Sequence, residues 1–135
     1  MSLRIGQYIA FALGADNAPE LSRLTGGRIA PVVQPEDDQN AMPYVWYYSD
    51  GLTEESTKDG HLSDVCTVQI EVVAPTYAVM LSLLQMVRTA MDEAIRVWNG
   101  SFGVADQSMT AGPEEYDDTQ QAYCRRLIYN IETYE

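Results

Sequence analysis

The sequence has few of the residues on which catalytic and nucleic-acid sites depend. Its 135 residues include one histidine, two cysteines, and 8 lysines and arginines against 20 aspartates and glutamates. Phosphate binding needs clustered Lys and Arg, so a formal net charge of −12 argues against this chain binding nucleic acid or an anionic membrane surface by itself. No apolar run approaches the roughly 20 residues of a membrane span.

Known catalytic and metal-binding motifs are also missing. The single histidine, His61, lies in a polar stretch, where a surface role is expected rather than membership of a Ser–His–Asp triad. Gly26-Gly27 lacks the spacing and the lysine of a P-loop. The densest acidic cluster lacks the alternating acids and central glycine of a calcium loop, so a solvated hairpin tip is expected; it consists of Glu114, Glu115, Asp117 and Asp118. We therefore expect no enzyme, no cofactor and no metal.

The two cysteines are expected to be structural. The N-terminus lacks the basic-then-apolar pattern of a signal peptide, because Gly6 and Gln7 interrupt its apolar residues. We therefore expect the protein to be cytosolic where it is made, in a compartment that keeps thiols reduced. Cys66 and Cys124 both fall in predicted strands, which favours two buried free thiols over a disulfide.

The most informative stretch runs from Cys66 to Trp98. Its first part alternates between apolar and polar residues, which is typical of a half-buried strand, and Pro75 ends it. Beyond Pro75 the period changes to steps of three and four, which predicts an amphipathic helix of about six turns. Thr76 is the expected N-cap, and Asn99-Gly100 the expected stop. The apolar stripe of this helix consists of Tyr77, Met80, Leu84, Val87, Met91, Ala94, Ile95 and Trp98.

The remaining elements are predicted from shorter patterns. A helix is expected over Leu3–Leu13, ended by Gly14, and a second short helix after an Asn17 cap, with Leu21 and Leu24 as anchors. Polar loops are expected at Gln34–Met42 and Ser49–Asp64, the latter long enough to be mobile. The expected strands are Arg28–Val33 at an edge, Tyr44–Tyr48, a weak Ser108–Tyr116, and Ala122–Tyr134.

Together these elements predict one α+β domain over residues 1–135. We expect two layers: an antiparallel or mixed β-sheet of about 4–5 strands packed by one long helix, plus a short N-terminal helical region. The strand face and the helix stripe should form the core. Its expected buried members are Val68, Ile70, Val72, Tyr77, Leu84, Val87, Met91 and Ile95.

A series of short motifs runs in order along nearly the whole chain. Its members are Gly27-Arg28-Ile29-Ala30-Pro31, Met42-Pro43-Tyr44-Val45-Trp46-Tyr47, a strand ending Val72–Tyr77, a helix Ala78–Trp98, and a strand Tyr123–Ile131. This series resembles the tail-component family of tailed phages and prophages, the tail-completion or tail-terminator-like proteins, although Ser101–Asp118 matches loosely and Leu52–Gly60 is unusually acidic.

This resemblance implies a small structural protein that forms a ring, often of six copies, at the tail end or the head–tail junction. The implied partners are further copies of the chain and the tail-tube or head–tail connector proteins, in the bacterial host cytoplasm during assembly and then in the virion tail. It implies no catalytic residues and no cofactor. Six copies would carry 6 × −12 = −72 charges, so a lumen that they line would repel DNA and let it slide.

Ring contacts are expected on the aromatic strands, at Tyr44, Trp46, Tyr48, Tyr123 and Tyr129. The alternative is a small dimeric ferredoxin-like module that binds a ligand or regulates another protein. A deep, mostly apolar pocket with convergent polar groups would favour that module, whereas a flat subunit would favour the ring.

Overall fold

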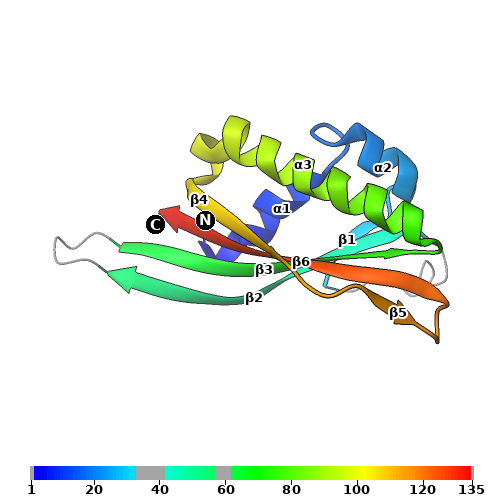
Figure 1. Ribbon diagram of the computed structural model, residues 1–135. Coiled ribbons are helices and arrows are strands. Elements are labelled where there is room, and N and C mark those ends of the chain that lie inside the picture. The colour runs from blue at the N-terminus through cyan, green and yellow to red at the C-terminus, as the bar shows by residue number, and fades with distance from the viewer. Residues whose placement is uncertain (1, 33–41, 57–61, 135) are drawn as a thin grey trace.

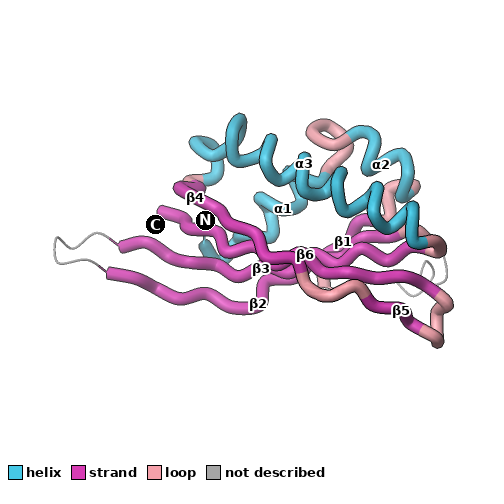
Figure 2. Tube along the Cα trace, in the orientation of Figure 1, coloured by secondary structure: helices cyan, strands magenta, loops and turns pink. Residues whose placement is uncertain are grey.

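A mixed six-stranded sheet carries the helices on one of its faces (Figures 1 and 2). The computed structural model describes residues 2–32, 42–56 and 62–134. The predicted two-layer α+β class is confirmed. The elements in order are η1 (Ser2–Arg4), α1 (Ile5–Leu13), α2 (Pro19–Thr25), β1 (Ile29–Pro31), β2 (Tyr44–Ser56), β3 (Leu62–Ala74), α3 (Tyr77–Phe102), β4 (Val104–Ala111), β5 (Glu115–Asp117) and β6 (Ala122–Tyr134).

The strand order is β1-β2-β3-β6-β4, with β5 pairing β6 beyond the end of β4. Only β1 pairs in parallel, with β2; the other pairs are antiparallel. The predicted edge position of the first strand is confirmed. The predicted strand Ser108–Tyr116 is instead two strands, β4 and β5, with Gly112–Glu114 between them. Pro113 has no backbone N–H with which to continue the pairing with β6.

The predicted polar loop Ser49–Asp64 is wrong for most of its length. β2 continues to Ser56 and β3 begins at Leu62, so the two strands form a long hairpin, and only residues 57–61, with His61, lie outside the described residues. This half of β2 is polar because its side chains are exposed on both faces from Ser49 to Glu55. The strand forms because its backbone pairs with β3, although its sequence has no alternating apolar pattern. The pairing continues past a bulge between Ser49 and Gly51.

The long helix begins as predicted and ends later. The Thr76 hydroxyl accepts a hydrogen bond from the backbone N–H of Val79 at 3.2 Å, which confirms the N-cap. The expected stop at Asn99-Gly100 is wrong, since α3 continues to Phe102. Gly103 then adopts φ +66°, a left-handed conformation that favours glycine, and turns the chain into β4.

The core lies between the sheet and α3, as expected, but the buried stripe of the helix is rotated. Leu83 and Ala90 are buried, whereas Tyr77 is 44% exposed and Ile95 is half-buried. Tyr77 lies in the first turn of α3, where its ring packs against Tyr123 and its hydroxyl donates to Glu114 at 2.7 Å. The expected core residues that are confirmed as buried are Val68, Ile70, Val72, Leu84, Val87 and Met91.

The N-terminal helices complete the helical layer. α1 ends before Gly14 as predicted, and Leu21 is buried while Leu24 is partly exposed. The predicted Asn17 cap is wrong: Ala18 precedes α2, and no side chain caps the helix. The Asn17 amide instead donates to the carbonyls of Ala12 (2.8 Å) and Ala90 (3.2 Å), which links the end of α1 to α3.

Both cysteines are buried and neither forms a disulfide, as predicted. They cannot form one with each other in this fold, because they lie on opposite faces of the sheet. Cys66 is part of the core under the helices, whereas Cys124 packs on the other face with Tyr44 and Val73.

Tyr129 provides a test of this packing. Its ring is 1% exposed, and its hydroxyl has no hydrogen-bond partner among the described residues. An unsatisfied buried hydroxyl costs about 1–3 kcal/mol in desolvation. Tyr129→Phe is therefore expected to leave the free energy of unfolding unchanged or to raise it by about 1 kcal/mol, measured by urea denaturation.

The matched control is Tyr44→Phe. The buried Tyr44 hydroxyl donates to Gln120 Oε1 at 2.8 Å, so its removal is expected to cost about 0.5–1.5 kcal/mol. If Tyr129→Phe costs as much as Tyr44→Phe, the Tyr129 hydroxyl has a partner and the prediction fails.

Candidate interaction face

No described helix covers the face of the sheet that lies opposite α1, α2 and α3 (Figure 2). We call it the open face. It carries alternate residues of β2, β3, β6 and β4, because successive side chains of a strand point to opposite sides. Those of β3 and β6 are largely polar at the centre of the sheet, where Glu71 lies opposite Arg126 and Thr67 opposite Asn130. A sheet face of this kind is available to another protein.

An aromatic pair lies on the β2 part of the open face. Trp46 and Tyr48 stack with ring centroids 5.2 Å apart and an interplanar angle of 22°. Both rings are half-buried. Trp46 also packs against a small buried cluster, which consists of Tyr44, Val73, Ala122 and Cys124. This packing restricts the Trp46 ring before any contact forms, which lowers the entropic cost of a contact.

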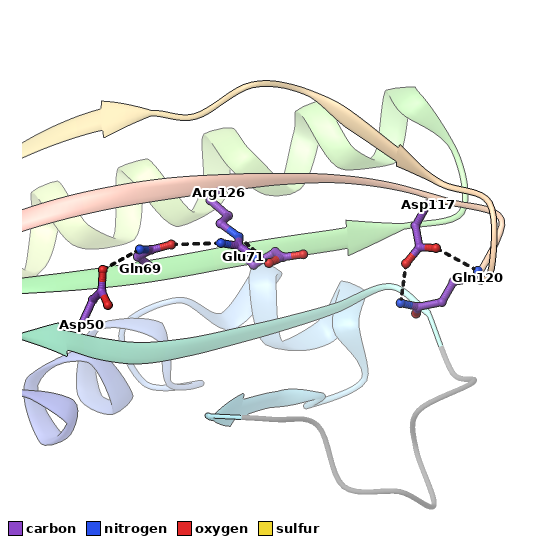
Figure 3. A network of polar contacts seen from close by, with 6 residues as sticks. All are labelled: Asp50, Gln69, Glu71, Asp117, Gln120 and Arg126. Carbon is purple, nitrogen blue, oxygen red and sulfur yellow. Dashed lines mark hydrogen bonds and ion pairs between the residues drawn. The ribbon is translucent and has the colours of Figure 1, made fainter.

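A polar network crosses three strands beside the aromatic pair (Figure 3). The Arg126 guanidinium donates to Glu71 Oε2 at 2.8 Å and to Gln69 Oε1 at 3.4 Å. The Gln69 amide in turn donates to Asp50 Oδ2 at 2.8 Å. Four side chains from β2, β3 and β6 are thereby fixed in place. Their charges remain partly exposed, as polar groups do at the rim of an interface.

A hollow of about 320 Å³ lies at the β5 end of the open face, with Cys124 in its wall beside Glu71 and Arg126. Burial raises the pKa of the Cys124 thiol, and the carboxylate of Glu71 raises it further. The thiol is thus protonated at neutral pH, whereas a nucleophilic cysteine needs a lowered pKa. The hollow has no features of a thiol active site.

A second hollow, of about 490 Å³, lies on the outer side of the helical layer. Its walls are mostly apolar and come from the start of α2, with Ala18 and Leu21, and from α3, with Met86 and Ala90. The nearby acids Glu20 and Glu93 are paired with arginines of their own helices and do not converge on it. It therefore lacks the placed polar groups of a ligand site.

The five predicted interface residues do not share one surface. Tyr44, Trp46 and Tyr48 lie on the open face, Tyr44 largely buried. Tyr123 is half-buried on the other face at the β5 end, and Tyr129 is buried under α3. Their contact with a neighbour stays a prediction, and only Trp46, Tyr48 and Tyr123 have side chains that a neighbour could reach without a rearrangement.

Two further tyrosines, Tyr77 and Tyr116, are exposed although the sequence did not predict them as interface residues. Tyr116 packs edge-on against Tyr123 with centroids 5.0 Å apart, and Tyr77 does so from the other side at 5.8 Å. Tyr77 and Tyr116 are 44% and 50% exposed. Neither shows an interface signal in the sequence, because Tyr77 continues the apolar stripe and Tyr116 stands alone among acids.

The predicted hairpin-tip acids are positioned individually rather than as a cluster. Asp117 accepts hydrogen bonds from the backbone amides of Thr119 and Gln120, and Glu114 accepts one from Tyr77. In the described ranges, no three His, Cys, Asp or Glu side chains are grouped so that they could hold a metal ion. Among the described helices, none is long and apolar enough to cross a membrane.

No protein-family model and no curated protein matches the sequence. One chain of the solved structure "Virion of native gene transfer agent (GTA) particle" matches with a TM-score of 0.63 and 16% identity, over 94% of this chain and 92% of that chain. The protein shares its fold with a virion chain. A second solved chain covers 96% of this chain at 14% identity, but its TM-score of 0.44 is too low to support an argument.

Proposed function

We propose that the protein is a non-catalytic structural component of a phage or prophage virion that forms a ring at the tail end or the head–tail junction. The observation that carries the proposal is the likeness, over nearly the whole of both chains, to a chain of a gene transfer agent virion. The ordered motifs that resemble tail-completion and tail-terminator-like proteins support the position on the tail.

The open face and the charge of the chain fit such a role. A ring subunit needs a surface for its neighbour and a surface for the next component of the particle, and the stacked pair of Trp46 and Tyr48 offers one of them. A conduit for DNA should not bind phosphates. Six copies would carry 6 × −12 = −72 charges, and such a field repels the DNA backbone.

The same charge predicts that assembly depends on salt. Repulsion between acidic subunits opposes the ring at low ionic strength, and the Debye length falls from about 10 Å at 0.1 M to about 3 Å at 1 M salt. Sedimentation velocity across this range is expected to show a shift from monomer toward a ring as salt rises. Purified tail tube is expected to capture the protein at salt concentrations where it is otherwise monomeric.

A strict monomer at every salt concentration that binds neither tail tube nor connector contradicts the proposal. If that monomer bound a metabolite tightly, the ligand-binding or regulatory module would replace it. The two hollows give that module weaker support, since the first is not mostly apolar and the second lacks convergent polar groups.

A further inference from the structure

Two opposite edges of the sheet lack a neighbouring strand in the described structure. On one side, β4 pairs only with β6. On the other side, β1 covers β2 only from Val45 to Tyr47, so the segment Tyr48–Ser56 pairs with β3 alone. Unpaired edges present rows of backbone N–H and C=O groups and serve as templates for another strand. Neither β4 nor Tyr48–Ser56 contains the lysine or proline that commonly protects an edge.

The two bare edges match in position and direction. Through β6 and β3, Val104 of β4 lies level with Glu54 of β2, and Met109 lies level with Ser49. β2 and β6 both pair antiparallel with β3, so they run in the same direction, and β4 runs against both. A rotation about an axis to which the strands are tilted, as in a β-barrel, keeps these directions and lets the two edges shift along each other. It therefore brings β4 of one copy against β2 of the next as an antiparallel pair.

The outward hydrogen-bonding groups can be assigned from the ladder. The backbone N–H of Gly112 donates to the Arg126 carbonyl at 2.8 Å. Because this pattern alternates along a strand, the backbone N–H and C=O groups of Thr110 and Ser108 also point toward β6, and those of Met109 and Ala111 point outward from the sheet edge. The backbone N–H of Gln107 already donates a hydrogen bond to Asp106 Oδ1 at 2.9 Å. The segment of β4 that can accept a new strand thus begins at Ser108.

The same reasoning applies to β2. The Val45 N–H donates to the Arg28 carbonyl, and the Tyr47 carbonyl accepts from the Val32 N–H. The backbone groups of Val45 and Tyr47 therefore point away from β3, toward the outer edge of β2. The bulge between Ser49 and Gly51 shifts the alternation by one residue, after which Leu52 and Glu54 face outward. When two edges pair antiparallel, a residue whose backbone groups point outward lies opposite another such residue. The side chains of two opposed residues lie on the same face of the sheet.

Several registers satisfy these conditions. The one nearest the level alignment that pairs Leu52 with an apolar residue shifts β4 by two residues. It places Met109 opposite Leu52 on the helix-bearing face, where Leu52 is 36% exposed and Met109 is half-buried. It places Ser108 opposite Thr53 on the open face, both of them small, polar and exposed. A cross-strand apolar pair of this kind adds to the stability that the backbone hydrogen bonds give a sheet.

We propose that β4 of each subunit pairs antiparallel with the second half of β2 of the next subunit, so that the ring is closed by a β-sheet continuous between copies. The inference rests on the proposed ring-forming function and names its interface. Head-to-tail closure covers both the β4 edge and the Tyr48–Ser56 edge of every subunit. A two-fold dimer through β4 alone would leave both β2 edges uncovered, which is an aggregation hazard.

The test is disulfide trapping with Thr53→Cys and Ser108→Cys in one chain. These two residues form a pair without ladder bonds, in which Cα atoms lie about 4.5 Å apart, within the range that a disulfide spans. After oxidation in high salt, non-reducing electrophoresis is expected to show a ladder of covalent oligomers that ends at the ring size. Mixing the two single variants is expected to give dimers only.

Three controls make the result specific. The wild type has only the buried Cys66 and Cys124 and should not cross-link. Thr53→Cys with Thr110→Cys, which is offset along the same face, should cross-link at least ten-fold more slowly. Dimers formed by Ser108→Cys alone would show the two-fold arrangement and overturn the inference.

Sedimentation of the same samples separates this inference from the proposed function. Rings that sediment normally but give no ladder with either cysteine pair overturn the β2–β4 interface and leave the ring function standing. A protein that is monomeric at all salt concentrations and does not bind tail tube overturns both.

Discussion

Replacing Leu84 with alanine is expected to lower the free energy of unfolding by about 2–5 kcal/mol, the usual range for a leucine buried in a well-packed core. Leu84 is 8% exposed on the sheet-facing side of α3 and belongs to the main core cluster. The substitution leaves a cavity that the rigid sheet can fill only in part. Urea denaturation followed by circular dichroism measures the loss.

Leu81→Ala is the matched control for this prediction. Leu81 lies in the same helix, one turn earlier, and is 42% exposed. Because it lies outside the core cluster, the same chemical change is expected to cost less than about 1 kcal/mol, as at most surface sites. Equal losses for the two variants would show that the stripe assigned to α3 is wrong.

Gln107→Leu is expected to lower the free energy of unfolding by about 1–3 kcal/mol, because it removes two hydrogen bonds that link three elements. The Gln107 amide donates to the carbonyl of Met91 in α3 at 2.9 Å. Its side-chain oxygen accepts from the Tyr8 hydroxyl of α1 at 2.9 Å. β4 is thereby held against both helices. Thermal and urea unfolding should both report the loss.

The control for Gln107→Leu is the same exchange at Gln85. Gln85 lies on the exposed side of α3 and bonds only the nearby Thr89, at 3.3 Å. Gln85→Leu is expected to change stability by less than about 0.5 kcal/mol. A Gln107→Leu variant as stable as the wild type would mean that the apolar gain of leucine offsets both lost bonds, which would contradict the linking role.

The sheet and the long helix could be predicted because each has one buried face. Alternation along β3 and β6 and the steps of three and four along α3 follow directly from burial on one side. Ala122–Tyr134 is a strand with the predicted bounds. Periodicity fails where burial is absent on both faces, as in the polar half of the β2–β3 hairpin, which the sequence analysis assigned to a loop.

The candidate face was only partly predictable. Trp46 and Tyr48 were expected in an aromatic strand, and the structure shows them stacked on the open face. Tyr129 was expected to contact a neighbouring subunit, but it lies under α3 because its position in β6 has the parity of the core residues Leu127 and Ile131. Sequence shows which residues of one strand share a face. It does not show which of those faces the helices cover.

The sequence by itself determined the α+β class, the direction of the core on each regular element, the reduced state expected of the cysteines, and a charge of −12 that opposes phosphate binding. These properties are local or additive, so composition and periodicity report them. Only the tertiary structure decided which sheet face stays open, how Gln69 and Arg126 meet across strands, and that β4 and β2 leave level, opposed edges. Those features depend on pairings between residues far apart in the chain, and no local pattern encodes them.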